Sequence, residues 1–131
     1  MTYLCSAYSD PDPAVRRARF EAVCRCAAAL MAKGHRILSP IAHSHPIAEA
    51  GDLPKGWEFW QAYDRELIAA CDEVWVFCHD GWYESKGVRA EIAIADELHK
   101  PLRYVFQRPD GEYEWRKSRA DGETVGPASR F

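Results

Sequence analysis

Two acidic residues, Asp64 and Glu91, stand at positions that helical spacing turns toward an apolar core. Asp64 comes four residues after Trp60 and four before Ile68. The inward stripe of that helix consists of Trp60, Tyr63, Leu67, Ile68 and Cys71. Burying a carboxylate is costly unless it is hydrogen-bonded or paired. Asp64 is therefore either a satisfied packing residue or a group that takes part in chemistry.

Glu91 lies on the core side of a second expected helix, three residues after Val88 and four before Ala95. We expect it in the first turn of that helix, where the helix dipole favours a negative charge. Stabilisation by the dipole alone, without a role in chemistry, is the alternative explanation for this residue. The helix also follows the expected central strand, and open α/β sheets bind ligands beyond the carboxyl ends of their strands. The joint placement of Glu91 and Asp64 favours a functional site.

Paired carboxylic acids in one crevice suit reactions that pass through a sugar cation. One carboxylate attacks or shields the anomeric carbon while the second acid manages a proton. The two acids therefore indicate cleavage of a glycosidic bond as the chemistry of this crevice.

The loop before Glu91 carries further candidates. Ser85 and Gly87 precede the expected helix start, where a hydroxyl and free backbone N–H groups can receive an anion, although Ser85 is equally suited to cap the helix. Asp80 follows the central strand, in place for sugar hydroxyls, and Trp82 offers a ring for a nucleobase to stack on. A core or subunit-interface role is the alternative for Trp82. The other aromatic residues near the crevice are Trp57, Phe59, Trp60 and Tyr83.

Several familiar site patterns are missing from the sequence. It has no glycine-lysine phosphate loop of the Walker type and no Gly-x-Gly-x-x-Gly after the first expected strand. Cys24 and Cys26 are two apart on an expected helix and point to different sides, while His43 and His45 lack a nearby third ligand. We therefore expect neither a metal nor a cofactor.

The elements that must position these residues alternate between strand and helix. We expect strands at 2–7, 35–39, 73–78 and 101–106, helices at 14–33, 56–71 and 88–99, and a long loop at 40–54. The central run EVWVFC is typical of a strand buried on both faces. This order predicts a single α/β domain with an open parallel sheet and helices on both faces, a flavodoxin- or Rossmann-like three-layer sandwich.

The length and composition of the chain indicate the number of domains, the classes of partner and the cellular compartment. With 131 residues, 47% of them hydrophobic, we expect one domain at 1–106. A polar extension at 107–131 would form an edge strand, contact another subunit or be disordered. The formal charge of -3 gives no general attraction to nucleic acid or to an anionic membrane. Five cysteines within hydrophobic segments indicate reduced thiols. The first residues show no basic region followed by an apolar run, and no stretch approaches the roughly 18 apolar residues of a membrane span, so we expect a cytoplasmic protein.

Three short motifs contain most of the candidates: YLCSAY at 3–8, DREL at 64–67 followed by CDEV at 71–74, and SKGVRAE at 85–91. Their order and approximate spacing over residues 2–106 resemble the nucleoside 2-deoxyribosyltransferase superfamily. This superfamily includes the 2'-deoxynucleoside 5'-phosphate N-hydrolases. The resemblance is closest to its small bacterial and phage members.

The resemblance implies a role for each matched residue. Glu91 would be the nucleophile that takes the deoxyribosyl unit, Asp64 would protonate or orient the departing base, and Tyr3 would position the nucleophile or the sugar. Ser85 stands where the transferases carry an aspartate and the nucleotide hydrolases a serine that meets the 5'-phosphate. This substitution favours a hydrolase that acts on a monophosphate.

The segment after the first strand departs from the hydrolases of that superfamily. Their phosphate loop carries glycine, serine and arginine there, whereas this chain has Ser6, Tyr8 and Ser9 as its candidates for substrate binding. Arg16, Arg17 and Arg89 are alternative phosphate ligands, although Arg16 and Arg17 suit a solvated helix face.

Three functions stay open from the sequence. The first is hydrolysis of a nucleoside or nucleoside 5'-monophosphate through a glycosyl-enzyme at Glu91, and the second is base exchange by a deoxyribosyltransferase through the same intermediate. The third is a non-catalytic nucleotide sensor, against which the presence of Tyr3, Asp64 and Glu91 together argues. Related enzymes complete their sites with residues of a neighbouring subunit, so the resemblance also implies a homodimer or larger homo-oligomer.

Overall fold

The computed structural model describes residues 1–117. Its helices are α1 (Pro13–Ala32), α2 (Pro40–Gly51), α3 (Trp57–Ala70) and α4 (Lys86–Glu97), and its strands are β1 (Thr2–Cys5), β2 (Ile37–Leu38), β3 (Glu73–Phe77), β4 (Leu102–Gln107) and β5 (Tyr113–Arg116). Of the expected extension at 107–131, residues 118–131 lie outside the described residues. No described helix combines the length and the apolar character that crossing a membrane requires.

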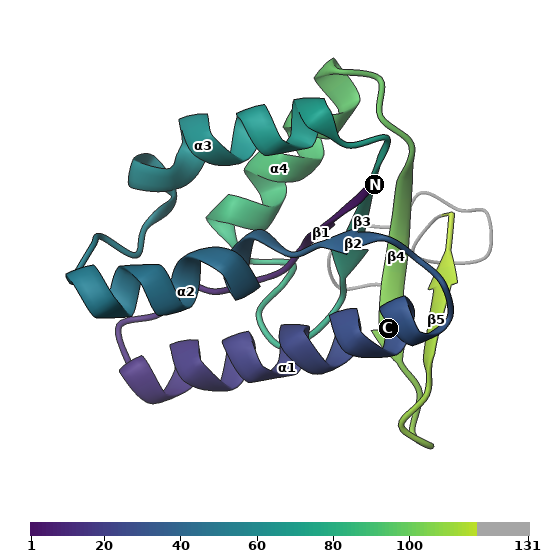
Figure 1. The fold of residues 1–131 in the computed structure, drawn as a ribbon, viewed down its shortest axis with the longest axis horizontal. Helices are drawn as coiled ribbons and strands as arrows, with labels where there is room; N and C mark the ends of the chain where they lie inside the picture. The colour runs from purple at the N-terminus through teal and green to yellow at the C-terminus, as the bar shows by residue number, and fades with distance from the viewer. Residues whose placement is uncertain (118–131) are drawn as a thin grey trace.

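The strands form one open sheet in the order β2-β1-β3-β4-β5. The first four strands are parallel, and β5 is antiparallel to β4. Helix α1 covers one face of the sheet while α3 and α4 cover the other (Figure 1). The prediction of an open α/β sandwich is confirmed. Between β1 and β3 the strand order reverses direction, which is where sheets of this kind bind ligands.

Successive side chains of the strands alternate between the two faces of the sheet. Tyr3 on β1 packs toward α3 and α4 in a cluster with Val76 and Val88, while Leu4 packs toward α1 with Val23 and its neighbours. Tyr3, Leu4 and Val76 are fully buried. The orientation of Tyr3 is therefore determined by the alternation along β1.

Residues 40–51 form helix α2, so the expectation of a long loop at 40–54 was wrong. Ser39 caps the helix, its hydroxyl accepting from the Ala42 N–H at 3.2 Å, and Pro40 occupies the first turn, where its missing N–H has no cost. Pro46 lies inside the helix, which removes one backbone hydrogen bond without ending it. The positions of both prolines are therefore compatible with a short capped helix.

Two smaller expectations also need correction. Helix α4 begins at Lys86, so Glu91 is in its second turn and is less stabilised by the helix dipole than expected. Tyr63 is 44% exposed rather than part of the buried stripe of α3.

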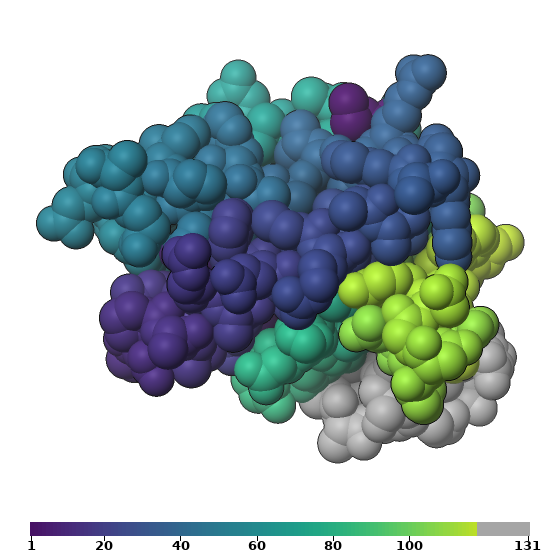
Figure 2. Space-filling view, turned by 60° about the horizontal axis from the view of Figure 1, so that its bottom comes forward, coloured from purple at the N-terminus to yellow at the C-terminus, as the bar shows by residue number. Residues whose placement is uncertain are grey.

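An edge strand was one of the three alternatives expected for the polar extension at 107–131. Residues 113–116 of that extension form such a strand, β5. The hairpin of β4 and β5 lies beside the carboxyl-terminal half of α1 (Figure 2). Nζ of Lys33, at the end of α1, lies 4.0 Å from Oε1 of Glu112 in the hairpin.

Candidate active site

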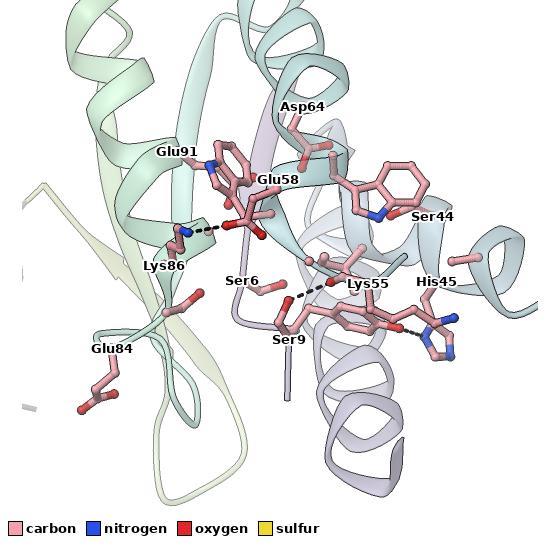
Figure 3. Close-up of a pocket in the computed structure, with 18 residues that line it drawn as sticks. Ser6, Ser9, Ser44, His45, Lys55, Glu58, Asp64, Glu84, Lys86 and Glu91 are labelled. Carbon is pink, nitrogen blue, oxygen red and sulfur yellow. Dashed lines mark hydrogen bonds and ion pairs between the residues drawn. The ribbon is translucent and has the colours of Figure 1, made fainter. Parts of the chain in front are cut away.

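A pocket of about 320 Å³ opens at the carboxyl ends of β1 and β3. It is lined by the segment after β1, by α2 and the loop that follows, by α3, and by the start of α4. Its volume is at the lower end of the range of small-molecule pockets, roughly 300–1,000 Å³. Figure 3 shows the carboxylates of Glu91 and Asp64 entering it from two helices that pack together.

The Tyr3 hydroxyl donates a hydrogen bond to Oε2 of Glu91. Glu91 is only 4% exposed, yet it lines the pocket. Burial raises the pKa of Glu91 to about 8, while the Tyr3 hydrogen bond lowers it and the nearby charge of Asp64 raises it. Burial, together with the charge of Glu91, raises the pKa of Tyr3 well above its ordinary value, so this hydroxyl keeps its proton and remains a donor. Both were expected site residues, and the structure brings them together.

Asp64 reaches the same pocket from α3 and is 7% exposed. No other described residue forms a hydrogen bond or an ion pair with its carboxyl group. Burial alone raises the pKa of Asp64 to about 6. A buried carboxyl group with a purely structural role is usually hydrogen-bonded or paired within the protein. Asp64 has no such partner among the described residues and lines the pocket, which favours an interaction of its carboxyl group with a bound ligand.

Ser6 and Tyr8, expected as substrate contacts, line the pocket from the segment after β1. Tyr8 shares a hydrogen bond of 2.6 Å with Nδ1 of His45, and the His45 ring stacks on Phe20 with centroids 4.2 Å apart. Two buried polar atoms of this wall, Ser6 Oγ and His45 Nε2, have no partner among the described residues. Both residues line the pocket, so a bound ligand is their natural hydrogen-bonding partner.

Ser9 is also among the lining residues, and its hydroxyl donates to the Lys55 carbonyl at 2.8 Å. This contact ties the segment after β1 to the loop before α3. Ser9 therefore has a structural role at the pocket rim besides any contact with a ligand.

Ser85 and Gly87 line the pocket at the start of α4. The Ser85 hydroxyl accepts a hydrogen bond from the Val88 N–H at 3.1 Å, so the serine is the N-cap of α4. Lys86 follows it and forms an ion pair with Glu58 in the first turn of α3. The two helix starts are thereby joined across the rim of the pocket.

Asp80 and Trp82 do not line this pocket. Asp80 is exposed and lies 3.4 Å from Arg19, and Trp82 is buried in the cluster between the sheet and α3 and α4. The aromatic walls come from Trp57 and Trp60 instead. Both tryptophans were noted as neighbours of the crevice, and their position at the start of α3 makes them the aromatic contacts.

Sequence reasoning missed the contribution of α2 to the pocket. Ile41, Ser44, His45 and Ala48 all line it, and their spacing is that of one helix face. That periodicity within residues 40–51 is the signal in the sequence that indicates the helix. Within residues 1–117, no group of three or more His, Cys, Asp or Glu side chains is arranged to hold a metal.

The fold and the pocket define an α/β protein with a pocket at the reversal of strand order. The chain belongs to the family described as a domain of unknown function, DUF1937, whose profile matches residues 1–106. None of the curated proteins matches the chain.

Proposed function

We propose that the protein is an enzyme that cleaves the N-glycosidic bond of a nucleoside or nucleoside 5'-monophosphate through a glycosyl-enzyme at Glu91. The observation that carries the proposal is the convergence of two buried carboxyl groups, Glu91 and Asp64, on one pocket, with the Tyr3 hydroxyl bonded to the first. The motifs at residues 3–8, 64–74 and 85–91 support it by their resemblance to the nucleoside 2-deoxyribosyltransferase superfamily.

In the first step, a carboxylate oxygen of Glu91 attacks the anomeric carbon as the bond to the base nitrogen breaks. The electron pair of that bond goes to the base, which takes a proton from Asp64. Tyr3 holds Oε2 of Glu91, so Oε1 is the oxygen free to attack. In the second step, water adds to the anomeric carbon, gives its proton to Asp64 and releases Glu91.

Because the pKa of Glu91 is about 8 and that of Asp64 about 6, the single proton of the pair lies mostly on Glu91 near neutral pH. The reactive form, with Glu91 ionised and Asp64 protonated, is therefore a minor form that the bound substrate must favour. Attack requires an ionised Glu91, and the Tyr3 hydrogen bond favours that form against burial. Protonation of the base requires a proton on Asp64, which burial helps to retain by raising its pKa to about 6. A developing sugar cation between the two groups further favours the ionised nucleophile.

Detection of free base tests the proposal. The wild-type protein and Glu91→Gln are incubated with 2'-deoxynucleosides, ribonucleosides and their 5'-monophosphates, with and without an added acceptor base, and the products are separated by chromatography. We expect base release that falls roughly 10³-fold or more in the variant. Mass spectrometry of acid-quenched wild type should detect a glycosyl adduct on the peptide that contains Glu91.

The same experiment separates the alternatives. Exchange of the acceptor base into the nucleoside, faster than hydrolysis, would make the protein a deoxyribosyltransferase using the same two carboxyl groups. Binding without release or exchange would make it a nucleotide sensor. As parts of the proposal, the enzyme is cytoplasmic, forms a homodimer or larger homo-oligomer, and acts without a cofactor on a small molecule rather than on nucleic acid or a membrane.

A further inference from the structure

We infer that the pocket selects an uncharged N-glycoside, a nucleoside without a 5'-phosphate. This inference rests on the proposed function and narrows its substrate class. Among the charged side chains that line the pocket there are two lysines, Lys55 and Lys86, and four acids, Glu58, Asp64, Glu84 and Glu91. No arginine among residues 1–117 lines it. Sites for phosphate groups depend on arginine or lysine, or on a helix start free of competing negative charge.

Both lysines are already paired with carboxylates. Lys86 forms its ion pair with Glu58, another lining residue. Lys55 lies 3.6 Å from Glu49 and 3.9 Å from Asp52, and its ammonium also donates to the Leu53 carbonyl at 2.8 Å. A phosphate would have to break these contacts and then compete with the same carboxylates for each ammonium group.

The arginines close to the segment after β1 are also committed elsewhere. Arg16 donates to the Asp10 carbonyl at 2.6 Å, and Arg19 donates to the Ser9 carbonyl at 2.9 Å and pairs with Asp80. These contacts brace the loop between β1 and α1. The arginine that the phosphate loop of the related hydrolases supplies therefore has no counterpart directed into this pocket.

The start of α4 is the remaining feature that favours an anion. Its N-cap hydroxyl on Ser85 already accepts from the Val88 N–H, and Glu84, immediately before it, has no ion-pair partner among the described residues. The negative charges of Glu84 and Glu58 offset the positive potential that the dipole of α4 creates at its start. That potential is confined to the first turn of the helix. The charge at this end of the pocket is therefore unfavourable for a phosphate dianion.

Two neutral groups of the pocket wall are left free for a ligand. Ser6 Oγ and His45 Nε2 are buried in the pocket wall without partners. Burial lowers the pKa of His45, so at neutral pH its ring is uncharged and offers a hydrogen bond without a positive charge. Hydroxyl groups of a sugar and heteroatoms of a base satisfy such atoms, and a phosphate dianion does not require them.

Paired substrates that differ only in the 5'-phosphate test the inference. The kcat/KM for base release is measured for the 2'-deoxynucleosides and for their 5'-monophosphates, and calorimetric titration of Glu91→Gln with both ligand sets gives their affinities without turnover. We expect kcat/KM and affinity to favour the nucleosides by about tenfold or more. Added salt should reduce the preference, because it screens the repulsion.

Variants that remove a negative charge from the rim of the pocket test whether these charges cause the preference for nucleosides. Glu84→Gln, Glu58→Gln and their combination should each reduce the preference for the nucleoside, by about two- to fivefold per charge removed. Glu66→Gln, at an exposed position of α3 that does not line the pocket, is the matched control and should leave the preference unchanged.

The outcomes distinguish the inference from the proposed function. Base release that favours monophosphates would overturn the inference and leave the enzyme proposal standing. If no base is released, tighter binding of nucleosides would support the inference for a sensor, and tighter binding of monophosphates would overturn it. Absence of binding to either ligand set would overturn the inference together with the proposed function.

Discussion

Tyr3 on β1 and Glu91 on α4 are joined by a hydrogen bond although they lie 88 positions apart in the sequence. The contact forms because the alternation along β1 turns Tyr3 toward α4, while helical spacing turns Glu91 back toward the sheet. Both side chains are buried, yet the carboxyl group of Glu91 still reaches the pocket. Among the described residues, it is the Tyr3 hydroxyl that favours the ionised form of Glu91 against burial.

Replacing Tyr3 by phenylalanine should therefore raise the pKa of Glu91 further. Since the reactive form has Glu91 ionised while Asp64 keeps its proton, a higher pKa of Glu91 makes that form rarer, and kcat/KM at neutral pH should fall by roughly tenfold or more. The alkaline limb of the pH profile of kcat/KM, which follows the pKa of Glu91, should move to higher pH. The measurement is kcat/KM for base release across the pH range. Tyr63→Phe is the control, because that hydroxyl bonds His43 outside the pocket and its loss should leave the profile in place. An unshifted alkaline limb in Tyr3→Phe, with undiminished activity at neutral pH, would contradict the role given to this hydrogen bond.

The raised pKa of Glu91 also makes a prediction for stability. Below its ordinary pKa of 4.5, the group is protonated in both folded and unfolded chains. Between pH 4.5 and about 8 the unfolded chain releases the proton while the folded chain keeps it, so stability is lost as the pH rises. Glu91→Gln removes this loss and should be more stable than wild type by a few kcal/mol at pH 8 but similar at pH 4.5.

Urea denaturation at the two pH values measures that difference in the free energy of unfolding. Glu66→Gln, an exposed acid of α3, should follow the wild type at both. A constant difference between Glu91→Gln and wild type would show that Glu91 titrates in the folded chain as it does in the unfolded one.

The substitution Asp64→Asn tests whether Asp64 supplies the proton to the departing base while Glu91 acts as the nucleophile. In the wild type, the reactive pair carries one proton, so activity should be highest between the pKa values of about 6 and about 8. The asparagine cannot supply a proton, so kcat should fall by roughly 10²- to 10⁴-fold, and most for bases that leave poorly. The decrease of activity at alkaline pH should also disappear, because only ionisation of Glu91 remains.

The measurement is the pH profile of kcat with bases of different acidity, and Asp96→Asn on the exposed side of α4 is the control. An equal loss for all bases, with the alkaline limb retained, would indicate that Asp64 positions the substrate without transferring a proton.

The positions of the two acids were predictable because period and burial agree within single helices. Asp64 and Glu91 are both buried on the faces that helical spacing indicates. The parallel direction of the first four strands follows from the alternation of strand and helix, since parallel neighbours require crossovers. These features depend on local pattern and on a small number of topological rules.

The walls of the pocket were harder to predict, because they depend on which loops meet. Trp82 follows β3 and was the first choice for stacking, but its side chain packs into the core, and Trp57 and Trp60 line the pocket from α3. His45 was placed in a loop, whereas it lies on α2 and reaches Tyr8 through tertiary packing. No pattern within one segment specifies such contacts between segments.

The role of Ser85 can be decided by two substitutions that differ in charge. Ser85→Ala removes the side-chain acceptor for the Val88 N–H and should cost about 1 kcal/mol of stability, whereas Ser85→Asp keeps a capping acceptor and adds a negative charge. If the serine acts only as a cap, Ser85→Asp should retain stability and turn over nucleosides like wild type, with monophosphates disfavoured further. Thermal denaturation and kcat/KM for both substrate types provide the readouts. Loss of monophosphate turnover in Ser85→Ala, beyond any loss with nucleosides, would instead show that the hydroxyl contacts a 5'-phosphate.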